Sequence, residues 1–206
     1  MPEGRFITFE GVDGAGKTTQ LEWAARFLRQ RDMPLTVTRE PGGTPLGEAL
    51  RAVLLDSGQT AHPETEMLLM FAARREHIDK VIVPALERGC VVLCDRFSDA
   101  TFAYQGGGSG VNVEKIETLE RLVHAEVQPD LTLYFDVPIE IARERVSAQG
   151  QADRFERESA VFFEKVRSAY LARAKRFPQR IHVIDASETP EQVSRVVESI
   201  LLSICP

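Results

Sequence analysis

Five short runs of mostly apolar residues, separated by helix-length segments, constrain the fold of this chain most strongly. The runs are Arg5 to Glu10, Leu35 to Thr38, Cys90 to Asp95, Leu131 to Asp136 and Ile181 to Asp185. They are apolar through their length instead of at every second residue, which is typical of strands buried on both faces. Such strands alternating with helices form a parallel sheet. The sequence therefore predicts an α/β fold, a five-stranded parallel sheet with helices on both faces.

The first run leads into a glycine-rich loop. Residues 11 to 18, GVDGAGKT, match the pattern G-x-x-x-x-G-K-[ST], and a helical pattern follows them. In such a loop, backbone N–H groups and the N-terminus of the next helix surround phosphate oxygens. The lysine, here Lys17, reaches the β and γ phosphates, and the hydroxyl of Thr18 binds Mg²⁺. The sequence of this loop therefore predicts a phosphate-binding site of the P-loop type.

An aspartate ends the third run. Asp95 is placed where the carboxyl ends of parallel strands hold ligands in open α/β sheets. We expect its carboxylate to hold Mg²⁺, partly through water. An alternative role is the N-cap of the next helix, since aspartate is a preferred capping residue. One side chain can serve both roles.

Three segments interrupt the alternation of strands and helices. Arg39 to Gly47 is expected to be a turn-rich loop, Gly106 to Gly110 a flexible stretch inside a helix, and Ala148 to Arg154 a polar excursion. Loops on a rigid α/β frame usually carry function. The last helix has its own start signal, because Thr189 and Gln192 have the spacing of a capping box.

Length and charge limit the classes of protein and of partner. A chain of 206 residues supports one ordinary core and is expected to form one domain. Its net charge of −6 argues against broad electrostatic binding to nucleic acid. No segment approaches the roughly 20 apolar residues of a membrane helix, and the amino terminus lacks signal-peptide character. We expect a cytoplasmic protein with no membrane partner. The cysteines and histidines lack zinc-ligand spacing.

Arginines near the loops favour a nucleotide kinase among P-loop proteins. A guanine-nucleotide switch commonly carries N-K-x-D, yet the single asparagine, Asn112, is followed by Val113. Kinases that move a phosphoryl group between nucleotides need cations for the acceptor phosphate and for the group in transfer. Each arginine can also be an ordinary surface charge. The candidates are Arg39, Arg74, Arg75, Arg96, Arg143, Arg145 and Arg154.

Four segments together resemble the bacterial thymidylate kinases, a family of P-loop nucleoside monophosphate kinases. They are EGVDGAGKTTQ, TREPGGTPLGE, DRFSDATFAYQGG and DLTLYFDV, and the similarity runs from Phe6 to about Asp185. The family transfers the γ-phosphoryl group of ATP to dTMP with Mg²⁺, giving dTDP and ADP for dTTP biosynthesis. The resemblance implies this activity, the P-loop kinase fold in one domain over residues 1–206, a lid at about 143–155, and a homodimer.

The resemblance also implies roles for individual residues. Arg39 and Arg96 would hold the acceptor phosphate, and Asp13 would accept a hydrogen bond from the sugar 3′-hydroxyl. The thymine and deoxyribose pocket would include Thr101, Tyr104 and Gln105, with Tyr104 crowding a ribose 2′-hydroxyl. Lys17, Arg96 and Asp13 are thus expected to act in catalysis. The loop residues expected to hold ATP are Gly11, Gly14, Ala15, Gly16, Lys17, Thr18 and Thr19.

Two positions depart from the family pattern. Family members usually carry a phenylalanine four residues before the arginine that contacts the base. With Arg74 as that arginine, Met70 stands at this place and Phe71 is beside it. Either is a candidate for stacking on thymine, and both can instead be core residues of a helix.

The second departure lies in the lid. The P-loop has no arginine, so the resemblance implies a catalytic arginine from the lid segment. Some relatives have an arginine-dense lid, while this one has Gln149 and Gln151. Arg154 matches the catalytic role best. Arg143 and Arg145 are weaker candidates, expected to bind ATP or, alternatively, only to orient the lid helices.

The sequence leaves alternatives open. A kinase acting on dUMP or another acceptor remains a rival, because one thymine methyl group is worth only about 1 to 3 kcal/mol in a pocket. A nucleotide-binding switch is a rival from another class.

Overall fold

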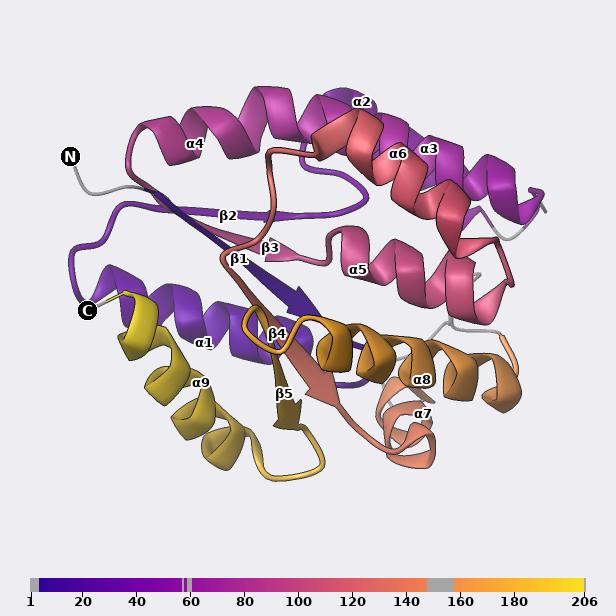
Figure 1. Cartoon of the computed structure of the whole chain (residues 1–206). Helices are drawn as coiled ribbons and strands as arrows, with labels where there is room; N and C mark the ends of the chain where they lie inside the picture. The colour runs from indigo at the N-terminus through magenta and orange to yellow at the C-terminus, as the bar shows by residue number, and fades with distance from the viewer. Residues whose placement is uncertain (1–3, 57, 59–60, 148–157, 206) are drawn as a thin grey trace.

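The computed structural model describes residues 4–56, 58, 61–147 and 158–205. All five predicted strands are present, as one parallel sheet in the order β2-β3-β1-β4-β5 (Figure 1). Observed and predicted bounds differ by one residue at most. The strands are β1 (Arg5–Glu10), β2 (Leu35–Arg39), β3 (Val91–Asp95), β4 (Leu131–Asp136) and β5 (Ile181–Asp185).

The strand register brings chemically active residues to one edge of the sheet. Asp95 of β3 lies opposite Phe9 of β1 on one side and opposite Arg39 of β2 on the other. Glu10 of β1 is opposite Tyr134 of β4. The P-loop therefore leaves the sheet beside the carboxyl ends of both β3 and β4, as expected of an open α/β fold.

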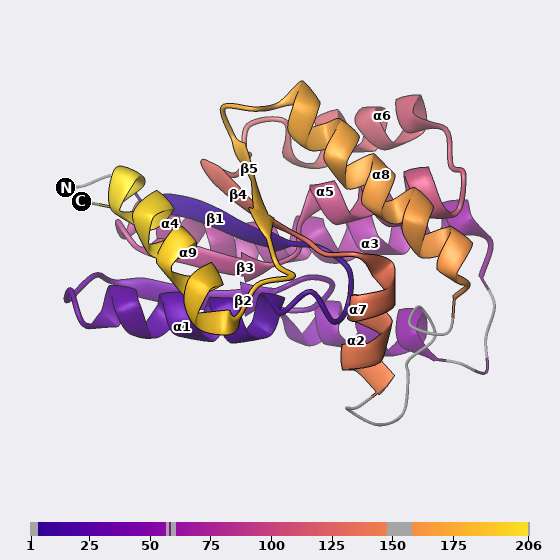
Figure 2. The same ribbon diagram turned by 90° about the horizontal axis from the view of Figure 1, so that it is seen from below.

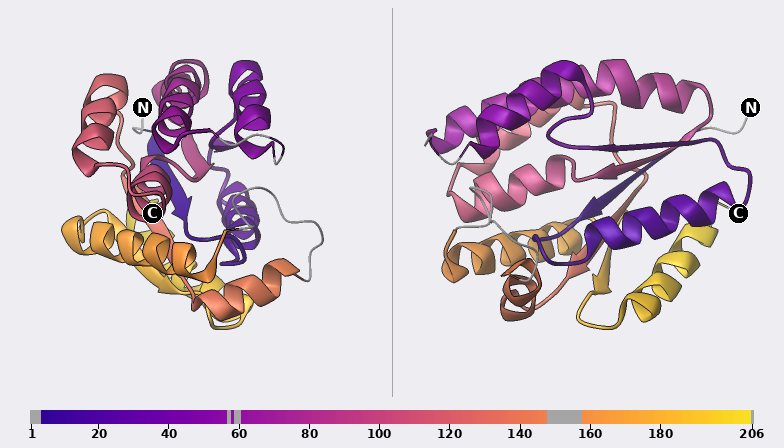
Figure 3. Two further views of the ribbon diagram at one scale, coloured as in Figure 1. Left: turned by 90° about the vertical axis from the view of Figure 1, so that its right-hand side faces the viewer. Right: turned by 180° about the vertical axis from the view of Figure 1, so that it is seen from behind.

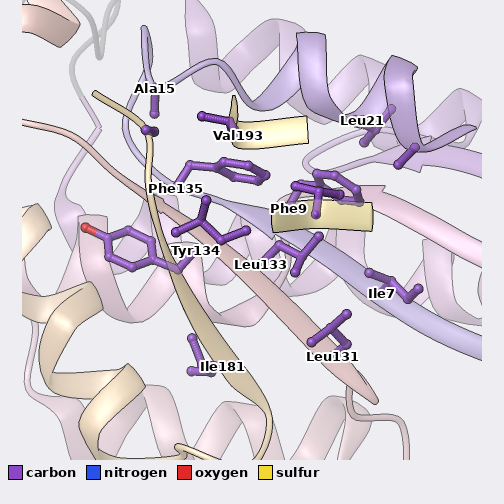
Figure 4. Packing of buried hydrophobic residues seen from close by; sticks show 14 of the residues in the cluster. Ile7, Phe9, Ala15, Leu21, Leu131, Leu133, Tyr134, Phe135, Ile181 and Val193 are labelled. Atoms are coloured by element: carbon purple, nitrogen blue, oxygen red, sulfur yellow. The ribbon is translucent and has the colours of Figure 1, made fainter. Parts of the chain in front are cut away.

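One face of the sheet is covered by α1 (Lys17–Arg29) and α9 (Pro190–Ile204), which pack side by side (Figure 2). Figure 4 shows side chains of β1 and β4 meeting those of both helices in this core. Helix α9 begins with the predicted capping box, in which Thr189 and Gln192 bond to each other's backbone N–H groups.

Helices also cover the opposite face. Phe6 and Val92 pack there against η1 (Ile78–Ile82) and α4 (Val83–Glu87). Helix α8 (Ala160–Arg176) contacts β4 and β5, and the rings of Tyr134 and Tyr170 stack with centroids 4.8 Å apart. The prediction of helices on both faces is confirmed.

The remaining helical elements lie towards the carboxyl ends of the strands. Helix α3 packs between α2 and α6, and the three lie close together in Figure 3. No helix within the described residues is long and apolar enough to cross a membrane. Most of the segment expected to form the lid, about 143–155, lies outside the described residues, because these do not include residues 148–157. These elements are α2 (Pro45–Leu55), α3 (Pro63–His77), α5 (Ser98–Thr101), η2 (Phe102–Gly108), α6 (Val113–His124) and α7 (Ile139–Ser147).

The glycine stretch predicted to be flexible is different in the structure. Gly106 to Gly108 belong to η2, a π-helical segment that packs closely on α8. A Cβ atom on Gly107 would lie 2.5 Å from the Cβ of Ala169, and one on Gly108 would lie 2.5 Å from the ring of Phe162. These two glycines are therefore required by the close approach of two helices, a contact that local sequence does not show.

Candidate active site

The glycine loop has the backbone conformation that its sequence predicts. Gly11 and Gly14 have φ angles of 143° and 82°, which a residue with a Cβ atom rarely adopts. A Cβ atom on Gly11 would also lie 2.7 Å from the carbonyl oxygen of Phe135 in β4. The loop is therefore held against the sheet and turns into the N-terminus of α1.

Lys17 is buried at the start of α1 and bonded to the loop itself. Its Nζ donates to the carbonyl oxygen of Val12 at 2.9 Å and to Oδ1 of Asp13 at 3.4 Å. Burial lowers the pKa of Lys17, and the neighbouring Arg96 charge lowers it further, while Asp13 acts in the opposite direction. The ammonium group is thus already placed inside the loop.

A cleft, called here the nucleotide cleft, follows the loop. Arg145 of α7 lines it and donates to the carbonyl oxygen of Ala186 at 2.9 Å. Arg143 is exposed on the same helix, and Arg154 lies outside the described residues. The expected ATP residues that line the cleft are Gly14, Ala15, Gly16, Lys17, Thr18, Thr19 and Arg145.

A second cavity, called here the arginine cavity, lies on the other side of the loop. It encloses about 660 Å³ of empty space, part of which is open to solvent. Asp13 lines both this cavity and the nucleotide cleft. The two hollows therefore meet at one carboxylate. The arginine cavity is lined by Asp13, Glu40, Pro41, Arg51, Leu55, Met70, Arg74, Arg96, Phe97, Ala100, Thr101, Tyr104 and Gln105.

Arg96 connects the glycine loop to the end of β3. Its φ angle is +67°, which is unusual for a residue with a side chain. Its backbone N–H donates to the carbonyl oxygen of Phe9. Its Nη2 donates to Oδ1 of Asp13 at 2.7 Å and to the hydroxyl of Tyr104 at 3.1 Å. Its Nη1 donates to the carbonyl oxygen of Gly11 at 3.0 Å. The guanidinium is fixed in the cavity wall.

Two opposing effects set the ionisation of Asp13. Burial raises its pKa, but the charges of Arg96 and Lys17 outweigh burial and hold the pKa below its usual range. Asp13 is therefore ionised, and the two neighbouring cations fix the orientation of its carboxylate.

Glu10 belongs to this site, although the sequence reading treated it only as the last residue of a strand. Its Oε1 accepts a hydrogen bond from the backbone N–H of Phe97 at 2.6 Å, and its Oε2 accepts one from the hydroxyl of Tyr170 at 2.8 Å. The side chain is fully buried, and burial raises its pKa to about 8. The signal that could have identified it is an acidic residue at the end of an apolar run.

Arg74 and Gln105 carry polar groups that the other described residues satisfy only in part. Arg74 Nε donates to Oε2 of Glu40 at 2.7 Å, and its Nη2 donates to the hydroxyl of Thr101 at 3.1 Å. Arg74 Nη1 and both amide atoms of Gln105 are buried without a hydrogen-bond partner among the described residues. Buried polar groups cost free energy when unpaired, so these atoms indicate a place for a polar ligand edge.

The two candidates for stacking on thymine have different surroundings in the structure. Met70 lines the arginine cavity, whereas Phe71 is 2% exposed and stacks on the ring of His124 outside that lining. Phe97 also lines the cavity, and the sequence analysis missed it because it gave roles in this segment only to charged and polar residues.

Two arginines near β2 differ in their surroundings. Arg39, expected at the acceptor phosphate, is about half exposed and pairs with Glu48 at 2.8 Å, outside the lining of the cavity. Arg51 of α2 lines the cavity and donates to the carbonyl oxygen of Pro41 at 3.1 Å. The sequence reading did not select Arg51, because its signal is only its position on a helix that returns to the site.

Asp95 and Thr18 are compatible with Mg²⁺. Oδ1 of Asp95 is buried without a hydrogen-bond partner among the described residues, and Thr18 lines the nucleotide cleft. Within the same residues no group of three or more His, Cys, Asp or Glu is placed to hold a metal. Mg²⁺ commonly uses one or two carboxylates together with phosphates and water. The alternative role of Asp95 as an N-cap is wrong, because Phe97 is the N-cap of α5 and no side chain caps it.

Comparison with known proteins identifies the family. The family model described as thymidylate kinase matches residues 9–197. The chain belongs to the thymidylate kinase family. Thymidylate kinases of Nitrosospira multiformis and Nitrosomonas europaea are 62% and 60% identical to it over 201 residues, covering 98% of this chain and 98% and 94% of theirs. The earlier resemblance is confirmed, and the chain is a phosphotransferase.

A solved structure is similar over nearly the full length. The crystal structure of thymidylate kinase from Ehrlichia chaffeensis has a TM-score of 0.81 and 37% identity, and the match covers 98% of this chain and 99% of that one. The P-loop kinase fold is thereby confirmed.

The raised pKa of Glu10 predicts a pH dependence of stability. Between about pH 4.5 and 8 the folded protein keeps a proton on Glu10 that the unfolded chain releases. The free energy of unfolding must therefore fall as pH rises through this window, by on the order of 3 to 5 kcal/mol from this group. In Glu10→Gln the group cannot titrate, so the variant should gain stability relative to the wild type from pH 5 to pH 8.5. Urea unfolding at both pH values measures the difference in the free energy of unfolding between the variant and the wild type. If that difference is the same at pH 5 and pH 8.5, the prediction is contradicted.

Proposed function

We propose that the protein transfers the γ-phosphoryl group of ATP to dTMP, giving dTDP and ADP. ATP would occupy the nucleotide cleft and dTMP the arginine cavity. The observation that carries the proposal is Asp13, which lines both hollows beside Lys17 and Arg96. Phosphoryl transfer requires donor and acceptor phosphates to meet in line, so two adjoining hollows with cations at their junction fit this reaction.

Charge neutralisation is the main work of the side chains in this proposal. Lys17 would contact the β and γ phosphates, and Arg96 would hold the acceptor phosphate. Asp13 would accept a hydrogen bond from the 3′-hydroxyl of the deoxyribose while it keeps Arg96 oriented. Lys17 and Arg96 both donate to the carboxylate of Asp13, so little reorganisation is needed when substrates arrive.

The far part of the arginine cavity would hold the base. Arg74 Nη1 and the Gln105 amide are buried and unpartnered among the described residues, so they would bond to the polar edge of thymine. Met70 and Phe97 would contact its faces. Of the two stacking candidates we propose Met70, since Phe71 is outside the lining. Tyr104, beside Arg96, would crowd a ribose 2′-hydroxyl.

Thr18 and Asp95 would hold Mg²⁺, with Asp95 acting partly through water. The ion supplies positive charge that neutralises the oxygens of the β and γ phosphates. Arg154 is the proposed catalytic arginine of the lid, and Arg145 would contact ATP from the cleft wall.

The test is ATP-dependent phosphorylation, with Mg²⁺, of dTMP, dUMP, dCMP, UMP, CMP, AMP and GMP. We expect strong preference for dTMP. Lys17→Ala is the control, and we expect its turnover to fall at least 100-fold, because the transferred group loses its cation. Its thermal unfolding should change far less. Slow loss of ATP with transfer to none of the acceptors would contradict the proposal and favour a nucleotide-hydrolysing switch.

Arg51 and Arg39 provide a matched pair for the acceptor phosphate. Arg39 keeps its proposed role there, and Arg51 is added because it lines the cavity. We expect Arg51→Ala to raise the KM for dTMP about tenfold, since a phosphate hydrogen bond is worth roughly 1.5 to 3 kcal/mol. Arg39→Ala should have the smaller effect, because Glu48 already engages this side chain. Steady-state kinetics at saturating ATP measure the KM for dTMP in both variants. A larger rise in Arg39→Ala than in Arg51→Ala would identify Arg39 as the main phosphate ligand.

We further propose that the protein is a cytoplasmic homodimer that associates through α2, α3 and α6. Large exposed apolar side chains occur on all three helices, including Leu46, Leu68 and Leu122. Leu68→Glu should shift sedimentation towards the monomer at micromolar concentration. Val196→Glu, at a similarly exposed position on α9, is the matched control and should not shift the sedimentation. Sedimentation that does not depend on concentration or on Leu68 would contradict this interface.

A further inference from the structure

The hydrogen bonds of Arg74 continue through two buried side chains to β2. Oε1 of Glu40 bonds to Nδ1 of His77 at 2.9 Å, and Nε2 of His77 bonds to the hydroxyl of Thr38 at 2.6 Å. The carboxylate of Glu40 can only accept, so Nδ1 of His77 carries the hydrogen. Glu40, Arg74 and His77 are all at least 96% buried. The chain of bonds links the end of β2 to α3 and, through Thr101, to α5.

Among the described residues, these bonds leave the Nη1 group of Arg74 without a partner. A guanidinium is planar, so the bonds from Nε to Glu40 and from Nη2 to Thr101 fix its plane. Nη1 has no partner among the described residues and belongs to a side chain that lines the arginine cavity. A ligand carbonyl oxygen at that point would accept from it. An amino group there would oppose donor to donor and leave both groups unpaired, which sites of this kind reject strongly.

Glu40 also balances the charge of Arg74. Burial raises the pKa of Glu40, but the charge of Arg74 and the bond from His77 outweigh burial, so the pKa is lowered and the carboxylate stays ionised. Without it, Arg74 would be an isolated buried cation in the same cavity as Arg51 and Arg96. Such a cation would compete with them for the phosphate of an acceptor. With Glu40 in place, the Arg74 pair suits the neutral edge of a base.

We propose that Glu40, held by His77, is a positioning residue that makes Arg74 select bases with a carbonyl group at this edge over bases with an amino group. The proposal rests on the proposed function, because it assigns substrate selection to the cavity in which dTMP would bind. Glu40 acts through Arg74. The selection would separate dTMP and dUMP from dCMP, whose ring differs at this edge by an amino group in place of a carbonyl.

The first experiment compares Glu40→Ala and Glu40→Gln with the wild type on dTMP and dCMP. In Glu40→Ala we expect the KM for dTMP to rise at least tenfold, and the ratio of kcat/KM for dTMP to that for dCMP to fall at least tenfold. The KM for ATP should be unchanged. Glu40→Gln should recover part of the ratio, because its amide oxygen can accept from Arg74 Nε and its N–H group can bond to the other tautomer of His77, while the charge of Arg74 stays unbalanced.

Binding of thymidine separates the base end from the phosphate end. Thymidine lacks the phosphate, so calorimetric titration reports only the base and sugar contacts. If Glu40 acts through Arg74 on the base, Glu40→Ala should weaken thymidine and dTMP by the same factor. A loss confined to dTMP would place the effect at the phosphate and would overturn the proposal.

Two further variants keep the test decisive if Glu40→Ala does not fold. His77→Ala removes the bond that orients Glu40 and leaves the Glu40–Arg74 pair in place, and we expect it to lower the dTMP to dCMP ratio about threefold. Arg167→Ala breaks a different ion pair, with Asp136 at 2.7 Å. As a control for lost stability alone, it should lower the melting temperature without changing the ratio.

The outcomes distinguish this inference from the proposed function. A wild type that does not phosphorylate dTMP contradicts the proposed function itself. The second outcome is a wild type that phosphorylates dTMP and a folded Glu40→Ala variant whose dTMP to dCMP ratio of kcat/KM stays within twofold of the wild type. This outcome overturns only the role of Glu40. If Glu40→Ala is unfolded, an unchanged ratio in His77→Ala overturns it instead.

Discussion

The ion pair between Arg96 and Asp13 is the contact on which the rest of the site depends. It joins the glycine loop to the end of β3, and the same guanidinium bonds to Gly11 and Tyr104. Arg96 adopts a positive φ angle to reach this place. Such conformations persist only where the surrounding structure determines them, and here the sheet register and the loop do so together. The junction of the two hollows is thereby fixed before either substrate binds.

Buried carboxylates recur at this edge of the sheet, and each has a distinct environment. Asp13 lies between two cations and is held ionised, whereas burial and the nearby charge of Asp99 raise the pKa of Glu10. Glu40 is ionised because Arg74 compensates it. Burying Asp13 and Glu40 as anions is costly, and hydrogen bonds from Arg96 and Arg74 compensate this cost and hold both arginines in one orientation. A preorganised site of this kind stabilises transferred charge without rearrangement during the reaction.

Much of the fold could be predicted from local pattern, because strands buried on both faces and the P-loop leave short-range signatures. The five strands, the loop and the capping box at Thr189 are of this kind. Contacts between distant segments could not be predicted. The glycines of η2 were read as flexible because their partner, α8, lies about sixty residues further along the chain. Arg51 was missed for the same reason.

The sequence by itself determined the sheet, the phosphate loop and the family, because these depend on the order and spacing of residue types along the chain. The tertiary structure alone decided which side chains meet. It brought Glu10 to the backbone N–H of Phe97 and Glu40 to Arg74, placed Met70 in the cavity and left Phe71 in the core. The physical reason is that hydrogen bonds and burial depend on distances between segments that are far apart in sequence, and those distances exist only after the chain has folded.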